Sequence, residues 1–119
     1  MRLALLLLAL HRPCSFNSPT PAWTQFDMQQ TAVCVADRWN ISLPKLRSVI
    51  DCESNWYRFA RNGDYRGLAQ HDIDYWPARV RAFDSLALEL KESIYNPRTQ
   101  LIVTAKMAAG SGWGAWACA

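Results

Sequence analysis

The sequence predicts a small α+β domain that is mostly α-helical. Apolar residues recur at helical spacing in several segments, each preceded by a residue that can cap a helix. Only one segment, around Asn62-Gly63, carries a hairpin-turn signal. The 119 residues allow one small domain. Half of them are hydrophobic and 19% are charged, which is typical of a folded chain.

Two helices are predicted in the first half of the chain. Asp27 can cap the first, which runs to about Trp39. Its apolar residues recur every three or four positions: Met28, Ala32, Val35 and Trp39. Ser42 can cap the second helix, in which Pro44 is tolerated in the first turn. Its apolar positions are Leu43, Leu46, Val49 and Ile50.

The second half begins with an irregular segment, residues 54–70, that can hold at most a two- or three-stranded ribbon. A further helix begins near Asp74, with Trp76, Val80 and Phe83 as its apolar stripe. Residues 84–95 are compatible with a short helix or a loop. Asn96 caps the last helix, Pro97 takes its first position and Gly110 ends it. Its inner stripe is Leu101, Ala105 and Ala108.

The N-terminal residues predict export from the cell. Arg2 precedes an apolar run, residues 3–10, that is too short for a bilayer, which takes roughly 20 apolar residues. A charged start followed by such a run is typical of a secretory signal peptide. We therefore expect a signal peptide over residues 1–22, a linker over 23–26 and a secreted domain over 27–119. The alternative is a misassigned start codon followed by a leader without function.

Composition excludes several classes of protein. The formal net charge is +3, but Arg2 and Arg12 belong to the predicted leader, and without them 11 basic residues face 10 acidic ones. This balance argues against a nucleic-acid binder. His11 and His71 are the two histidines, and no His or Cys spacing suggests zinc, so we expect neither metal nor cofactor. The six Trp exceed what a small core needs, and some are expected to line a groove.

Glu53 is the candidate catalytic residue. It lies three residues after Ile50 and four after Val49, on the apolar stripe of the second helix and at its C-terminal end. Burial and the negative end of the helix dipole both disfavour a charged carboxylate there and should raise its pKa. A carboxylic acid that stays protonated near neutral pH suits a general acid. The alternative is a Glu that turns to solvent or pairs with Arg58 or Arg61.

Four motifs occur together in one order along the chain. They are Cys52-Glu53-Ser54-Asn55-Trp56, Gly67-Leu68-Ala69-Gln70, Tyr95-Asn96-Pro97 with Gln100, and Gly112-Trp113-Gly114-Ala115-Trp116-Ala117-Cys118. This ordered set, across roughly residues 27–118, resembles the lysozyme-like superfamily. The resemblance is to soluble lytic transglycosylase domains and to the catalytic domains of resuscitation-promoting factors. It implies a small lysozyme-like fold with a short β-hairpin region beside an active-site groove.

The resemblance also implies roles for individual residues. Glu53 corresponds to the family's single catalytic glutamate, Gln70 to the glutamine that lines the sugar groove, and Tyr95 to a tyrosine that often faces the glutamate. Ser54 belongs to the same motif and is expected to contact substrate. A disulfide between Cys52 and Cys118 is implied as well. Cys34 would then be free, or would pair with Cys14 if the leader is cut earlier.

Glycosidases usually need two carboxyl groups. Asp64, Asp72 and Asp74 are candidates for the second, and Asp64 is expected across the groove from Glu53, although an Asp is also a common turn residue. Without a second carboxylate, the resemblance implies a lytic transglycosylase that cuts the MurNAc–GlcNAc bond of peptidoglycan and leaves a 1,6-anhydro sugar. Four tryptophans are candidates for sugar stacking, with core packing as the alternative: Trp56, Trp76, Trp113 and Trp116.

Other functions stay open at this point. A hydrolytic lysozyme would use Glu53 with a second Asp. A non-catalytic module would bind cell-wall glycan without needing a buried Glu. A Cys/His hydrolase would need Cys52 as a free thiol beside His71. A secreted structural or inhibitor protein would not act on peptidoglycan. For the favoured enzyme we expect a monomer whose partner is the peptidoglycan strand, with no membrane span.

Overall fold

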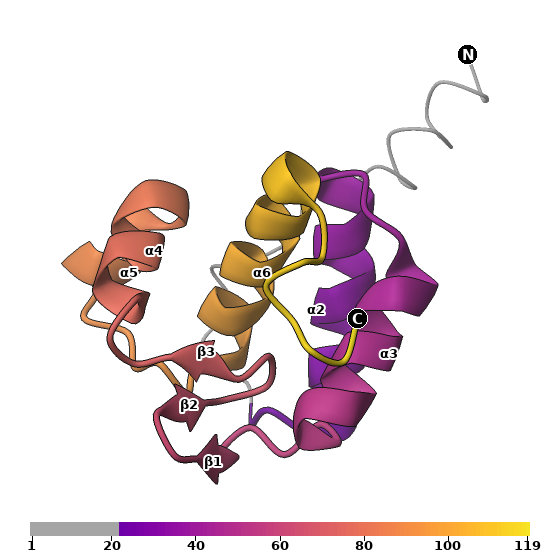
Figure 1. Ribbon diagram of the computed structural model, residues 1–119, viewed down its shortest axis with the longest axis horizontal. Helices are drawn as coiled ribbons and strands as arrows, with labels where there is room; N and C mark the ends of the chain where they lie inside the picture. Colours follow the sequence, from indigo (N-terminus) through magenta and orange to yellow (C-terminus); the bar gives the residue numbers. More distant parts are fainter. Residues whose placement is uncertain (1–21) are drawn as a thin grey trace.

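The computed structural model describes residues 22–119, so the predicted signal peptide up to residue 21 and Cys14 lie outside the described residues. Five helices and three short strands follow one another in the described part (Figure 1). The helices are α2 (Gln25–Arg38), α3 (Leu43–Ser54), α4 (Trp76–Phe83), α5 (Ser85–Glu89) and α6 (Pro97–Ser111). The strands are β1 (Arg61–Asn62), β2 (Tyr65–Arg66) and β3 (His71–Asp72). This is the mostly helical α+β architecture that the sequence predicts.

Helix α6 forms the centre of the molecule. Figure 1 shows α2 and α3 on one side of it and α4 and α5 on the other. The larger apolar core joins α2, α3 and α6, and includes Ala32, Leu46 and Leu101. A smaller core joins α4 and α5 to α6 through Trp76, Val80, Ala87 and Val103. The predicted stripe on α6 is buried, but its polar neighbours Thr99, Gln100 and Thr104 are buried too. Such all-round burial is typical of a central helix.

Helix α2 begins earlier than the sequence suggested. Thr24 is its N-cap and Asp27 is the third residue, and the two form a reciprocal capping box. Gln25 and Phe26 are therefore helical, which corrects the predicted linker over 23–26. The predicted C-terminal end is confirmed, because α2 ends at Arg38 and Trp39 caps it.

The other predicted caps are largely confirmed. Ser42 accepts a hydrogen bond from the Lys45 backbone N–H, and Asn96 accepts one from that of Thr99. Helix α6 runs through Gly110, however, and ends at Ser111 with Gly112 as its cap. Gly112 has a φ of 75°, a conformation that glycine adopts without strain. The ambiguous segment 84–95 contains the short helix α5.

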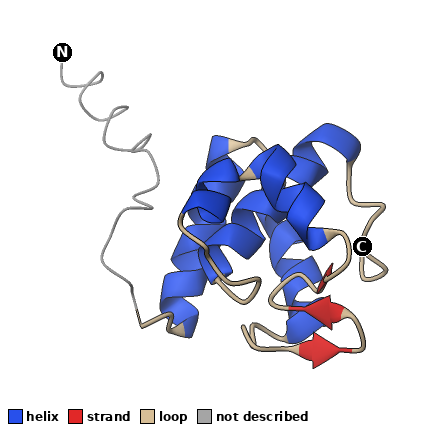
Figure 2. Cartoon of the chain, turned by 90° about the vertical axis from the view of Figure 1, so that its left-hand side faces the viewer, coloured by secondary structure: helices blue, strands red, loops and turns tan. Residues whose placement is uncertain are grey.

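The three strands form a small antiparallel sheet in the order β1-β2-β3. Asn62 pairs with Tyr65, so Gly63 and Asp64 make the two-residue loop, and Gly63 has a φ of 60°. The loop is thus centred one residue after the predicted Asn62-Gly63 pair. Figure 2 shows the strands gathered at one end of the helical body. Residues 55–60 connect the end of α3 to β1.

Candidate functional site around Glu53

Glu53 lies in the last turn of α3, and its side chain is half-buried. Burial raises the pKa of Glu53 above its ordinary value, and a hydrogen bond from the Cys118 backbone N–H partly offsets that rise. The described ion pairs do not join it to Arg58 or Arg61. A protonated carboxyl group is therefore favoured here relative to an exposed Glu, in the direction that the position on the α3 stripe predicts.

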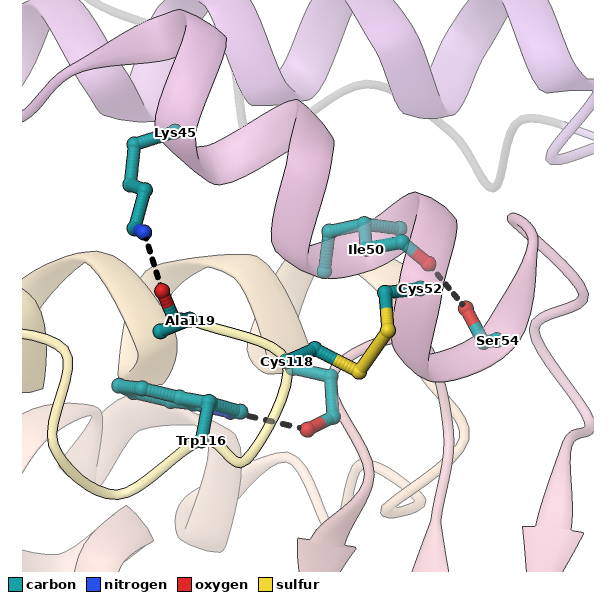
Figure 3. The surroundings of a disulfide bond; sticks show 8 residues. Lys45, Ile50, Cys52, Ser54, Trp116, Cys118 and Ala119 are labelled. Carbon is teal, nitrogen blue, oxygen red and sulfur yellow. Dashed lines mark hydrogen bonds between the residues drawn. A yellow bond between two sulfur atoms is a disulfide. The ribbon is translucent and has the colours of Figure 1, made fainter.

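The chain after α6 returns to cover the end of α3. A disulfide joins Cys52 to Cys118, 66 residues apart in sequence, as the family resemblance implied (Figure 3). Lys45 Nζ also donates a hydrogen bond of 2.6 Å to the Ala119 backbone oxygen. Because Cys52 precedes Glu53, the disulfide holds Cys118 beside the candidate acid. The last residues of the tail are thus part of the environment of Glu53.

None of the described cysteines is a free thiol. Cys34 is also disulfide-bonded, so the expectation that it could be free is wrong, and its predicted pairing with Cys14 lies outside the described residues. A Cys/His hydrolase with Cys52 as nucleophile is excluded in this state, because the sulfur of Cys52 is bonded to that of Cys118.

Trp116 anchors the tail to the loop between β2 and β3. Its indole is buried and donates a hydrogen bond of 3.0 Å to the Ala69 backbone oxygen. Its ring lies 5.7 Å from that of Trp113 and 5.9 Å from that of His71, centroid to centroid. Trp76 packs in the smaller core. For Trp76 and Trp116 the structure therefore supports the core-packing alternative, and Trp113 is partly buried against the larger core.

His71 is fully buried at the junction of β3, α4, α6 and the tail. Its Nδ1 lies 3.0 Å from Arg79 Nη1 and its Nε2 lies 2.8 Å from Thr104 Oγ1. Burial, together with the Arg79 charge, lowers the pKa of His71 to about 3. Since Arg79 can only donate, the neutral ring accepts at Nδ1 and carries its proton on Nε2. The side chain therefore holds elements together and is unsuited to exchange protons near neutral pH.

The glutamine of the Gly67-Leu68-Ala69-Gln70 motif faces its own loop. Gln70 Nε2 donates to the backbone oxygens of Gly67, at 2.9 Å, and Ala60, at 3.2 Å. The side chain is half-buried. These bonds fix the start of β1 to the β2–β3 loop. Contact between Gln70 and sugar stays a prediction.

Gln100, on α6, holds the same loop from the other side. Its Oε1 accepts from the Ala69 backbone N–H at 3.1 Å, and its Nε2 donates to the backbone oxygens of Arg66, at 3.1 Å, and Ile94, at 2.7 Å. Gly67 leaves room for this amide, because a Cβ there would lie 2.4 Å from Gln100 Nε2. Gly67 and the Gln100 amide are thus packed so closely that a side chain at position 67 would clash with the amide.

Two consecutive left-handed residues follow Glu53 and Ser54. Asn55 has a φ of 49° and Trp56 a φ of 62°, a conformation that costs a tryptophan energy. The Trp56 side chain is only 5% exposed, and its indole N–H donates to the Asp51 carboxylate. The structure therefore places Trp56 in the core, and the predicted sugar-stacking surface at this residue is not available. Asn55 and Trp56 reverse the direction of the chain, and exposed Tyr57 and Phe59 follow them.

Tyr95 contacts Phe59, which in turn contacts Tyr57, and the sequence reasoning did not place either residue in the site. The Tyr95 ring lies 5.9 Å from Phe59, and Phe59 lies 6.1 Å from Tyr57. Phe59 and Tyr57 are exposed by 48% and 62%, and the Arg58 guanidinium lies 4.3 Å from the Phe59 ring centroid. Aromatic residues at alternate positions directly after the Cys52-Glu53-Ser54-Asn55-Trp56 motif were the signal available in the sequence.

The remaining predicted site residues have local roles. Ser54 Oγ donates to the Ile50 backbone oxygen at 3.2 Å, so the hydroxyl is used within α3. Asp64 is exposed in the β1–β2 loop, as the turn interpretation expects, and its backbone oxygen accepts from Ile73. Asp72 caps a turn by accepting from the Asp74 backbone N–H at 2.8 Å. No second carboxylate is brought to Glu53 by these contacts.

A second half-buried carboxyl group occurs elsewhere. Burial raises the pKa of Asp84, and neighbouring Glu92 adds to this, while Arg98 and Lys106 oppose it. Glu92 forms an ion pair with Arg98 and accepts from the Thr99 hydroxyl. Asp84 lies between α4 and α5, on the opposite side of α6 from α3 (Figure 1). It therefore cannot serve as the partner of Glu53.

Within residues 22–119, no group of His, Cys, Asp and Glu is arranged to hold a metal ion, and no helix has the length and apolar character of a membrane span. A cavity of about 290 Å³ lies on α4, and no predicted site residue lines it. The comparisons find no match among protein-family models, curated proteins or solved structures.

Proposed function

We propose that this protein cleaves the MurNAc–GlcNAc bond of peptidoglycan as a lytic transglycosylase, with Glu53 as the general acid and base. The observation that carries the proposal is the half-buried Glu53 carboxyl group, whose pKa is raised by burial at the end of α3. The disulfide between Cys52 and Cys118 supports it, because it holds the tail against the same group. The secreted location proposed for the chain agrees with an extracellular substrate.

The proposed reaction needs one carboxyl group in two protonation states. Protonated Glu53 gives its proton to the glycosidic oxygen as the bond to C1 of MurNAc breaks. The resulting carboxylate then takes the proton of the C6 hydroxyl of the same MurNAc, whose oxygen bonds to C1. The products are a 1,6-anhydro sugar and a free C4 hydroxyl on GlcNAc. No water enters, and Glu53 ends protonated as it began.

Two observations favour this route over a hydrolytic lysozyme with two carboxylates. Asp64, the foremost candidate for the second group, is exposed in a turn, and Asp84 lies beyond α6. A non-catalytic glycan-binding module remains the alternative of another class. The raised pKa of Glu53 favours the enzyme over this module, because glycan binding does not require a half-buried acid.

The deciding experiment is digestion of purified peptidoglycan by the protein and by its Glu53→Gln variant, followed by mass spectrometry. We expect wild type to release 1,6-anhydro fragments and Glu53→Gln to lose at least about a thousandfold in rate, as expected when the only acid is removed. Fragments one water heavier would indicate hydrolysis instead. Equal activity of the two proteins would rule out Glu53 as the acid, and binding without turnover would support the binding module.

A further inference from the structure

Three aromatic side chains form a continuous surface next to the end of α3. Tyr57 contacts Phe59 edge to face, and Phe59 contacts Tyr95, with ring centroids 6.1 Å and 5.9 Å apart. Phe59 and Tyr57 are among the exposed large hydrophobic residues, and Tyr95 is half-buried. Aromatic residues gathered at a surface, rather than scattered over it, mark binding sites. This group is called the aromatic platform below.

The backbone holds the platform rigidly from both sides. Asn55 and Trp56 reverse the chain, and the buried indole of Trp56 fixes that reversal. The Tyr57 N–H then donates to the Ser54 oxygen at 3.0 Å. On the other side, the Tyr95 N–H donates to Ser93 Oγ at 3.0 Å, just before the cap of α6. Binding to a preorganised surface loses little conformational entropy.

Positive charge accompanies the platform. Arg58 stacks on Phe59 with its guanidinium 4.3 Å from the ring centroid, and exposed Arg61 follows in β1. Within residues 22–119, no ion pair joins Arg58 or Arg61 to a carboxylate. Guanidinium groups form bidentate bonds with carboxylates, and aromatic rings pack against the C–H faces of sugars.

We propose that the aromatic platform, with Arg58, binds a glycan strand that carries carboxylate groups. This inference deepens the proposed function, since the lactyl and peptide groups of peptidoglycan supply such carboxylates. Tyr57, Phe59 and Tyr95 pack against the sugars, and Arg58 contacts an acidic substituent. The platform begins four residues after Glu53, and the Tyr57 N–H is bonded to the oxygen of Ser54, the residue next to Glu53, so a strand lying on the platform lies near the candidate acid.

The test measures binding of the inactive Glu53→Gln protein to insoluble peptidoglycan, with chitin as a glycan that has no carboxylates. Phe59→Ala, added to Glu53→Gln, should weaken binding to both about tenfold. Arg58→Gln should weaken binding to peptidoglycan but leave binding to chitin within twofold. Two controls are Phe26→Ala, at an exposed ring on α2, and Arg81→Gln, at an exposed arginine on α4, and each should leave binding within twofold.

The outcomes separate this inference from the proposed function. If Phe59→Ala, shown to be folded by circular dichroism, binds peptidoglycan like its parent, the platform is not a binding site. If Arg58→Gln weakens both polymers equally, the preference for acidic glycan is wrong. If wild type cleaves no peptidoglycan but Phe59→Ala still weakens binding about tenfold, the platform stands and the enzymatic proposal falls. In an active protein, Phe59→Ala should raise KM and leave kcat nearly unchanged.

Discussion

His71 shows at the level of a single residue how a histidine is kept neutral. Both ring nitrogens are bonded, and the nearest cation, Arg79, donates to one of them. The pKa in the folded protein, about 3, lies below the ordinary value of 6.5. The resulting stabilisation is therefore complete above pH 6.5 and is lost as the pH falls toward 3. Each pH unit in this range costs about 1.4 kcal/mol for the one proton involved.

We expect the His71 ring to stay neutral, with its proton on Nε2, at pH 5. The physical reason is that protonation would place a second cation beside Arg79 in a site without solvent. Long-range nitrogen–proton NMR spectra recorded between pH 7 and pH 4.5 distinguish the two tautomers and the charged ring. A titration midpoint for His71 near 6.5 would contradict this assignment.

Sequence reasoning predicted the partial burial of Glu53 and the direction of its pKa shift but not the environment of His71, and the reason is physical. The position of Glu53 depends on residues within two turns of its own helix, and helical spacing reveals those. The neighbours of His71 come from α4, α6 and the tail, at Arg79, Thr104 and Trp116. No spacing along the chain brings such residues together, so only the folded structure identifies them.

At the level of elements, the conformation of the β2–β3 loop depends on its hydrogen bonds and close packing to Gln100 of α6. Gly67 and Gly63 both have positive φ values, 80° and 60°, so an alanine strains the backbone at either position. Only at Gly67 would the added Cβ meet another residue, the buried amide of Gln100 at 2.4 Å, whereas nothing lies within 4 Å at Gly63. Comparing alanine substitutions at the two glycines therefore separates the free-energy cost of backbone strain from that of a packing clash.

Gly67→Ala should destabilise the fold more than Gly63→Ala, by at least about 2 kcal/mol, because Gln100 must give up hydrogen bonds to make room. Gly63→Ala itself should cost about 1–2 kcal/mol from strain alone. Urea unfolding followed by circular dichroism measures both values. Equal losses for the two variants would mean that Gln100 moves aside freely and does not hold the loop.

Helix boundaries show where local sequence suffices. Ser42 and Asn96 act through hydrogen bonds to residues three positions along the chain, and both caps were predicted. The start of α2 was misplaced because Asp27 can serve either as a cap or as the third residue of a capping box. The sequence supports both choices, and Thr24 decides between them in the structure.

At the level of the whole molecule, the Cys52–Cys118 disulfide joins the end of α3 to the tail. Its pairing came from family resemblance and not from the spacing of the cysteines, which four cysteines leave ambiguous. Two hydrogen bonds also hold the tail: the Trp116 indole donates to the Ala69 backbone oxygen, and Lys45 donates to that of Ala119. Residues from both halves of the chain thus form the environment of Glu53.

Replacing both Cys52 and Cys118 by alanine should lower stability by about 2–4 kcal/mol, because the unfolded chain is no longer constrained. Substitution is preferable to a reductant, which would also act on the disulfide of Cys34. Lys45→Met is the matched control, because it removes the exposed hydrogen bond to Ala119, and such a bond contributes less than about 1 kcal/mol to stability. Thermal and urea unfolding measure both. If the double variant unfolds like wild type, the disulfide does not stabilise the tail.

Cys118 comes after α6 in the chain and bonds to a partner 66 residues upstream. The tail is therefore held covalently beside Glu53 only once this bond has formed. A chain in which both cysteines are reduced relies on the hydrogen bonds of Trp116 and Lys45 alone to keep the tail over α3.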